Sequence, residues 1–328
     1  MKRNYINNAI YAIIILCILK VNICLANQKS DGEISLNDSG RKIEAHYTKQ
    51  LLNLHDELKQ KIPSESEATG PALKQFLSSD KHDPKLVKFV ILEKATPRDL
   101  AEFGQLGKGY FSLLESLFND PKLMRQMLVA DGARAKRMGR KGYGPPQYGK
   151  AMEIYSKIQD SCKNASAGIF QRLALAISLE HAVPVVQTNP AEDTNAPDTV
   201  DPVKRYHHYK KAYLDGELDP TFKNLSTWDL RMVVNGDEPD ETLAWGREML
   251  RNYRPDHIYN ENFGWRYVAI VGSDVKYGSG DVKYDRPELQ KYQNILMNGG
   301  VCGRRAFIGR FILRAFGVPT TARPSRGH

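Results

Sequence analysis

The sequence has few of the features that identify a protein class at once. Only four cysteines occur in 328 residues. That is too few for a disulfide scaffold, so a sizeable hydrophobic core must hold the fold. No glycine-rich phosphate-binding motif and no zinc-type spacing of cysteine and histidine is present. The sequence therefore predicts no cofactor and no metal site.

No hydrophobic run is long enough to span a membrane. The longest, residues 9–19, has about half the length that a spanning helix needs. Lys2 and Arg3 precede it and the small Ala26 follows it, which is typical of a secretory signal peptide over residues 1–26. We therefore expect a secreted or periplasmic protein, with an uncleaved anchor as the alternative and no other stable membrane anchor.

The composition is that of a globular protein with a modest positive charge. Hydrophobic residues make up 41% and charged residues 26%, and the formal net charge is +9. A positive surface favours acidic partners. The basic stretch suited to an acidic polymer contains Arg134, Lys136, Arg137, Arg140 and Lys141. A solvated loop is the alternative, and no motif indicates a specific nucleic-acid partner.

The first half of the chain carries helical signals. Residues 27–42 are polar and are predicted to form a flexible leader. Residues 43–186 are predicted to form a helical region, because caps followed by a first-turn proline occur at Thr96-Pro97 and Asp120-Pro121. A further helix is expected over about 169–179.

A proline-rich stretch separates this region from the second half. Residues 187–202 contain three prolines and many small polar residues, and we predict a linker. The adjacent His207 and His208 have no further metal ligands at suitable spacing, so both are predicted to be surface residues. Residues 265–271 are rich in β-formers and are predicted to be the first strand of residues 203–328.

The most informative segment is NGGVCGRRAFIGRFILRAFGVPTTARPSRGH, residues 298–328. Gly299-Gly300 allows a tight turn and the close approach of another group. Cys302 then stands at or just before the first turn of an apolar helix that Gly317 ends. A thiol there faces unpaired N–H groups and the positive end of the helix dipole, which favour the nucleophilic thiolate.

A nucleophilic thiol needs positive surroundings and an imidazole partner. Arg304 and Arg305 supply positive charge next to Cys302 in the sequence. His328 lies 26 residues after the cysteine. A strand from about Thr320, packed beside the helix, would return the chain toward Cys302 and bring His328 to it.

These residues resemble the core of the transglutaminase-like superfamily, one of the papain-like groups of cysteine enzymes. The resemblance rests on Gly-Gly-x-Cys, on the helix end Arg-Ala-Phe-Gly-Val-Pro and on the later Gly-His. It implies that Cys302 is the nucleophile, that His328 is the general base and that Trp265 assists oxyanion stabilisation. It also implies an α+β fold, a helical N-terminal region followed by a transglutaminase-like core over 203–328.

The resemblance is incomplete in one respect. The family places an Asp or Asn on a strand after the histidine, and no such residue follows His328. The sequence is therefore interpreted as a C-terminally truncated fragment that would be inactive by itself.

Two functions and one structural interpretation of Cys302 remain open. The leading one is an exported cysteine-dependent enzyme that acts on amide bonds through a thioester, as a protease, a deamidase or an acyl transferase. The alternative is a catalytically inactive transglutaminase-like binding or structural module with a basic surface for polyanions. A third interpretation makes Cys302 half of a disulfide with Cys162. The sequence does not choose the substrate, which would be a protein or peptide.

Overall fold

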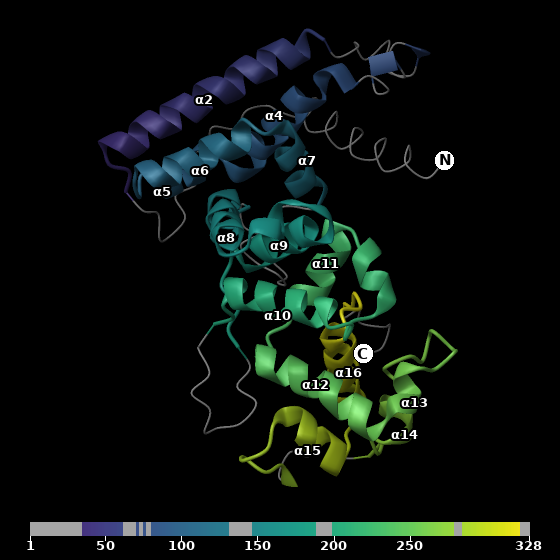
Figure 1. Ribbon diagram of the computed structural model, residues 1–328. Helices are drawn as coiled ribbons and strands as arrows, with labels where there is room; N and C mark the ends of the chain where they lie inside the picture. Colours follow the sequence, from purple (N-terminus) through teal and green to yellow (C-terminus); the bar gives the residue numbers. More distant parts are fainter. Residues whose placement is uncertain are drawn as a thin grey trace. The chain divides into compact units, whose positions relative to one another are not determined.

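A computed structural model of the chain describes most of it, and helices are its regular elements (Figure 1). The described residues are 35–61, 70–71, 75–76, 80–130, 146–187, 199–278 and 284–321. No strand occurs among them, and β-type pairing is limited to two isolated bridges, Val186 with Thr199 and Tyr277 with Gly300.

The described residues form α-helices and short 3₁₀ helices. In chain order they are α2 (Asp38–Lys59), η1 (Asp80–His82), α4 (Asp83–Ala95), α5 (Pro97–Gly104), α6 (Lys108–Phe118), α7 (Pro121–Val129), α8 (Tyr148–Ser161), η2 (Lys163–Ser166), α9 (Gly168–His181), α10 (Pro202–Leu214), η3 (Pro220–Asn224), α11 (Thr227–Val234), α12 (Asp240–Tyr253), α13 (Pro255–Ile258), α14 (Ile270–Ser273), α15 (Lys291–Asn298) and α16 (Cys302–Ala315). Within the described ranges, none of these helices combines the length and the apolarity that crossing a membrane requires.

The predicted α+β fold is wrong, because the described part of the chain is helical. The clearest error is the strand predicted over 265–271, where the chain makes turns and then forms α14. Two of the β-forming residues, Tyr267 and Ile270, are buried in the core instead. Tyr267 stacks on Phe316 with ring centroids 4.4 Å apart, and its hydroxyl donates to Asp219 over 2.8 Å. Packing of individual side chains, not strand pairing, uses these residues.

The chain divides into two compact units, residues 1–153 and 154–328. This division lies within α8 and differs from the predicted linker at 187–202. The reason is α9, whose residues 173–181 are all buried. A helix that is apolar on nearly all sides must be covered on several faces. In the second unit α10 and α11, which follow the proline-rich stretch, supply that cover.

The predicted helix starts depend on local chemistry, and the structure confirms them. The Thr96 hydroxyl accepts from the Asp99 N–H at 3.1 Å, and the Asp120 carboxylate accepts from the Leu123 N–H at 2.9 Å. The flexible leader predicted over 27–42 is wrong for its last residues, because α2 already begins at Asp38, with Asn37 as its N-cap. The predicted helix near 169–179 is α9.

The first unit is built around α2. This helix packs mainly against α5 and also against α4, while α4 packs against α7. Tyr47 is fully buried, its ring lies 5.2 Å from that of Phe118, and its hydroxyl donates to Glu115 at 2.9 Å. Burial and the neighbouring Glu115 carboxylate raise the pKa of Tyr47 well above its usual value. The Tyr47 hydroxyl therefore stays protonated and remains a hydrogen-bond donor to the Glu115 carboxylate.

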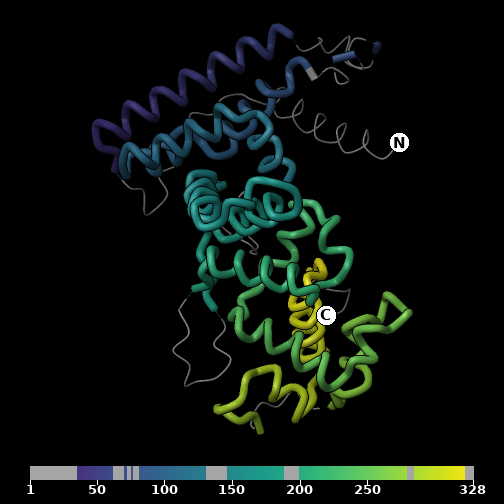
Figure 2. The backbone as a smooth tube through the Cα atoms, in the orientation of Figure 1, coloured from purple at the N-terminus to yellow at the C-terminus, as the bar shows by residue number. Residues whose placement is uncertain are grey.

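The second unit is built around α16, which packs closely against α12 and also contacts α11, α14 and α15 (Figure 2). The Phe311 ring is central to this packing. It stacks on Tyr292 at 3.8 Å between centroids and lies 6.1 Å from Trp245. Gly246 allows α12 to approach this ring, since a Cβ there would lie 2.6 Å from Phe311. The close approach of α12 to α16 therefore depends on the absence of a side chain at Gly246.

We expect Gly246→Ala to destabilise the second unit by about 1–3 kcal/mol, because the new methyl group overpacks a core in which Phe311 is already stacked. The three tryptophans, Trp228, Trp245 and Trp265, all lie in this unit, so urea unfolding followed by tryptophan fluorescence measures it. Gly272→Ala is the matched control, because a Cβ there meets nothing within 4 Å. Equal unfolding midpoints for the two variants would contradict the packing argument.

Candidate functional site

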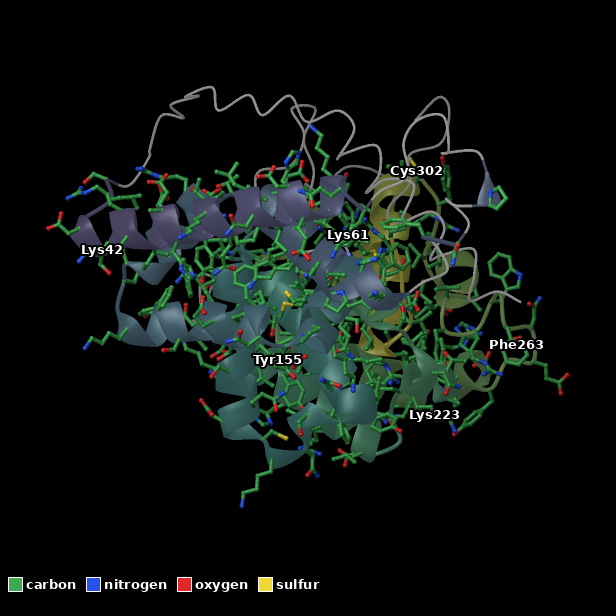
Figure 3. All side chains as sticks on the ribbon, turned by 90° about the horizontal axis from the view of Figure 1, so that it is seen from above. Lys42, Lys61, Tyr155, Lys223, Phe263 and Cys302 are labelled. Carbon is green, nitrogen blue, oxygen red and sulfur yellow. The ribbon has the colours of Figure 1, made fainter. Side chains whose placement is uncertain are left out.

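Cys302 is the first residue of α16, as predicted, and its thiol is free and exposed. Figure 3 labels it at the end of this helix. The N-cap, Val301, has no polar side chain that could accept from the first turn. The first backbone N–H groups of the helix are therefore available to a ligand or to the sulfur.

The two glycines before Cys302 allow two segments of the chain to come close together. Gly300 donates its N–H to the Lys276 carbonyl over 2.9 Å. Gly299 has a φ of 73°, and a Cβ on it would lie 2.3 Å from the same carbonyl oxygen. Both the backbone conformation and the space require glycine at residue 299. The predicted tight turn is confirmed, and its partner is the segment at Lys276–Tyr277.

The first predicted charged neighbour, Arg304, is used to fix this turn. Its Nη1 and Nη2 lie 3.0 Å from the two carboxylate oxygens of Asp285. Asn298 donates to the same carboxylate at 2.8 Å. Burial opposes the charge on Asp285, but the hydrogen bonds from Arg304 and Asn298 outweigh it and lower the pKa of this carboxyl. Arg304 is therefore a paired cation rather than a free one.

The second predicted charged neighbour is Arg305, which contacts residues that precede the turn in the sequence. The Arg305 guanidinium donates to the Val275 carbonyl and lies 5.6 Å from the centre of the Tyr277 ring. Together the two arginines attach the first turn of α16 to residues on both sides of the segment 279–283. The sequence predicted their proximity to the thiol but not this anchoring.

The opposite end of α16 is closed by backbone bonds. Gly317 has a φ of 75°, its N–H donates to the Arg314 carbonyl, and the Val318 N–H donates to the Leu313 carbonyl, both over 2.9 Å. This is a Schellman motif, which needs a residue in the left-handed conformation. The predicted helix end at Gly317 is confirmed.

Buried side chains add further hydrogen bonds to the carbonyls at that end. Arg247 donates to the Ala315 carbonyl at 2.9 Å, and the Tyr209 hydroxyl donates to the Arg314 carbonyl at 3.1 Å. Arg247 is also paired with Glu217 over 2.8 Å. A helix end inside a core requires such partners, because unpaired buried carbonyls cost free energy.

A fully buried arginine organises the loop that faces this end. Arg205 has no exposed surface, forms an ion pair with Asp240 and donates to the carbonyls of Gly236 and Glu238. The Glu238 side chain in turn accepts from the Tyr292 hydroxyl at 2.9 Å and from Arg314 at 3.3 Å. The loop 236–240 thus connects α10 and α12 to α15 and α16.

The other predicted site residues are Trp265 and His328. Trp265 lies in the turn before α14 and is 56% exposed. No hydrogen bond or ring contact joins it to Cys302 among the described residues. His328 lies outside the described residues. The strand predicted from Thr320 does not form at its start, where Thr320 donates to the Met232 carbonyl at 3.2 Å.

The remaining sequence-based expectations have mixed outcomes. The disulfide that was left open is not formed, since Cys162 is a buried free thiol and Cys302 an exposed one. The basic stretch at Arg134–Lys141 lies outside the described residues. His207 is exposed as predicted, whereas His208 is partly buried. No cluster of three potential metal ligands occurs in the part of the chain that the structure describes.

His208 was wrongly predicted to be a surface residue because its neighbours are distant in the sequence. Arg247 lies 3.2 Å from its Nε2 atom, and Arg205 is also near. Burial first, and then the charges of these two arginines, lower the pKa of His208 to about 3. The imidazole is therefore neutral in the folded protein and accepts from Arg247.

We expect the stability of the second unit to fall as the pH decreases below about 6.5, the pKa of an unfolded histidine. His208 protonates there only in the unfolded chain, so each pH unit costs up to about 1.4 kcal/mol. His208→Gln should flatten this slope between pH 6.5 and 5, above the range in which Glu217 titrates, because the pKa of Glu217 is lowered by Arg251 and Arg247 despite burial. Chemical denaturation at several pH values measures the slope.

The matched control for this measurement is the neighbouring histidine. His207→Gln changes an exposed imidazole, so it should leave the slope as in the unchanged protein. If His208→Gln and His207→Gln behave alike, His208 is not the group responsible.

We expect iodoacetamide to alkylate Cys302 in the native protein and to leave Cys162 unmodified until the protein unfolds. The exposed thiol of Cys302 is accessible, whereas Cys162 is only 7% exposed. Peptide mapping by mass spectrometry at increasing reaction times measures both rates. Comparable rates in the folded protein would show that Cys302 is not selectively accessible.

The comparisons with known proteins give no relative for this arrangement. No family model, no curated protein and no solved structure matches the chain. The function must therefore be argued from the residues themselves.

Proposed function

We propose that this protein is an exported cysteine-dependent enzyme that cleaves amide bonds, with Cys302 as the nucleophile and His328 as the general base. One observation carries the proposal: Cys302 is a free, exposed thiol at the uncapped start of a 14-residue helix. Export rests on the predicted signal peptide over 1–26. The proposal depends on these residues and not on an α+β fold.

The reaction takes place in two steps. His328 accepts the thiol proton, and the sulfur attacks the carbonyl carbon of the amide. The C–N bond breaks, the amine leaves with the proton from the imidazolium, and a thioester remains on Cys302. Water, deprotonated by the same imidazole, then attacks the thioester and releases a carboxylic acid. A substrate amine in place of water would give acyl transfer; we assign hydrolysis as the main reaction.

Backbone N–H groups of the first turn suit the negative charge that develops in this reaction. The tetrahedral intermediate carries an oxyanion close to the sulfur. The Cys302 N–H is among the groups at this helix start that no N-cap side chain occupies. Donors fixed in advance stabilise the oxyanion without reorganisation, and the ion pair of Arg304 with Asp285 holds this turn in place. The contribution of Trp265 stays a prediction.

The segment that ends in His328 is long compared with α16. A helix of 14 residues is about 21 Å long. The chain after Thr320 includes eight residues, which span at most about 26–29 Å when extended. The extended reach of these eight residues therefore exceeds the length of α16, which the assignment of His328 as the base requires.

The chain by itself is expected not to cleave amides, but an activated ester needs only a nucleophilic thiol. We therefore expect p-nitrophenyl acetate to acylate Cys302 in a burst of one equivalent, because such a thiol forms a thioester faster than it is hydrolysed. Peptide mapping should place the acetyl group on Cys302, and hydroxylamine should remove it. Cys302→Ser should abolish the burst. His328→Ala should slow the burst and the subsequent hydrolysis by about 10²-fold or more, the usual contribution of a general base.

His207→Ala is the matched control, since it removes an exposed histidine elsewhere in the same unit. It should leave the burst unchanged. A burst that survives in Cys302→Ser would refute the proposed function. Normal rates in His328→Ala would leave the thiol assignment intact and overturn only the choice of base.

A further inference from the structure

A second thiol, outside the proposed site, lies against a lysine. Cys162 follows α8 and is 7% exposed. The Nζ atom of Lys210, on α10, lies 2.7 Å from its sulfur, and the Tyr206 hydroxyl donates to the sulfur at 3.7 Å. All these residues belong to the second unit. The cluster thus joins a thiol, an amine and a phenol from two helical segments.

The lysine is aimed at the sulfur rather than at solvent or a carboxylate. Its Nζ lies 5.5 Å from the centre of the Phe170 ring, and its side chain is partly buried. In the described part of the chain, the sulfur is the polar group to which it donates. The neighbouring His207 is bonded instead to Ser161, at 3.0 Å. Cys162 and Lys210 therefore form a pair of their own.

The surroundings favour the charged form of the thiol. Burial alone would raise the pKa of Cys162, but hydrogen bonds from Lys210, Tyr206 and the backbone at Asn164 outweigh it and lower this pKa. A thiolate is the species that reacts with peroxides. Hydrogen peroxide is small enough to enter beside a residue that is 7% exposed and bordered by a partly buried lysine.

We propose that Cys162 is a site of oxidation by hydrogen peroxide and that its oxidised sulfur condenses with Lys210 to form a covalent sulfur–nitrogen cross-link. The observations that carry this inference are the separation of 2.7 Å between Sγ and Nζ and the partial burial that shields the pair. It is independent of the function proposed for Cys302.

Atoms and electrons balance over the two steps, which are oxidation of the thiolate and condensation with the amine. The Cys162 thiolate attacks one oxygen of hydrogen peroxide, an S–O bond forms and the O–O bond breaks. The Lys210 ammonium gives a proton to the departing hydroxide, which becomes water, and the amine is then neutral. The amine attacks the sulfur of the sulfenic acid, the S–O bond breaks, and the leaving hydroxide takes a proton from nitrogen as a second water. Sulfur has lost two electrons, and peroxide has been reduced to two waters.

The cross-link would connect the end of α8 with α10. These segments already meet through the bond of Tyr206 to Cys162, so the link requires only a small movement of the lysine side chain. A thiol reagent reverses it, because a thiol attacks the sulfur and releases the amine. Cys302 is the internal comparison, since none of the described contacts joins a lysine to its sulfur.

The experiment treats the full chain with hydrogen peroxide and maps its tryptic peptides without reduction. We expect the peptides of Cys162 and Lys210 to be joined, with a mass two hydrogen atoms below the sum of the separate peptides. Trypsin should no longer cut after Lys210, and dithiothreitol should restore both peptides. Cys302 should be oxidised without forming a link to a lysine.

Lys210→Arg is the matched variant, because it keeps a cation beside the sulfur and removes the reactive amine. Here dimedone, which traps sulfenic acids, should label Cys162, and no cross-link should form. The inference is overturned if Cys162 stays unmodified while Cys302 is oxidised, if Cys162 is oxidised but Lys210 stays unlinked, or if the joined peptides retain an oxygen atom. These outcomes are measured on the unchanged protein, so they do not depend on the folding of the variant.

Discussion

The second unit depends on a buried cation. Arg205 has no exposed surface, and a buried charge is tolerated only when it is paired and hydrogen-bonded. Its partners are the Asp240 carboxylate and the carbonyls of Gly236 and Glu238, so the loop 236–240 must close around the guanidinium. Burial raises the pKa of Asp240 even though Arg205 opposes this shift. Each charge therefore stabilises the other, and loss of either one would leave its partner without an ion pair in this largely buried loop.

The position of the candidate thiol follows from this closure. The loop presents Glu238 to Tyr292 of α15 and to Arg314 of α16, and these are the two helices that flank the Gly299-Gly300 turn. The far end of α16 is held by Arg247 and Tyr209, and its first turn by Arg304. Cys302 is thus the exposed end of a helix whose other contacts are fixed. A nucleophile held in this way loses little freedom when it reacts.

Much of this arrangement can be predicted where the chemistry is local. The caps at Thr96 and Asp120 involve residues three positions apart, and Gly317 ends α16 by its own backbone conformation. Interactions between segments that lie far apart in the sequence could not be predicted. The strand predicted over 265–271 failed because Tyr267 is buried against Phe316, and a buried aromatic favours a strand only when a sheet is present.

The glycines at 299 and 317 lie on either side of the helix that carries the thiol, and neither depends on the chemistry of that thiol. Gly299 is required by the Lys276 carbonyl, and Gly317 by its conformation and by the Phe222 ring, which a Cβ would approach to 2.7 Å. In homologous chains these two positions should therefore vary less than Cys302 itself. A chain that keeps both glycines and has lost the cysteine would retain this helix and both of its ends without the thiol. The two glycines therefore report shared ancestry, and the cysteine reports activity.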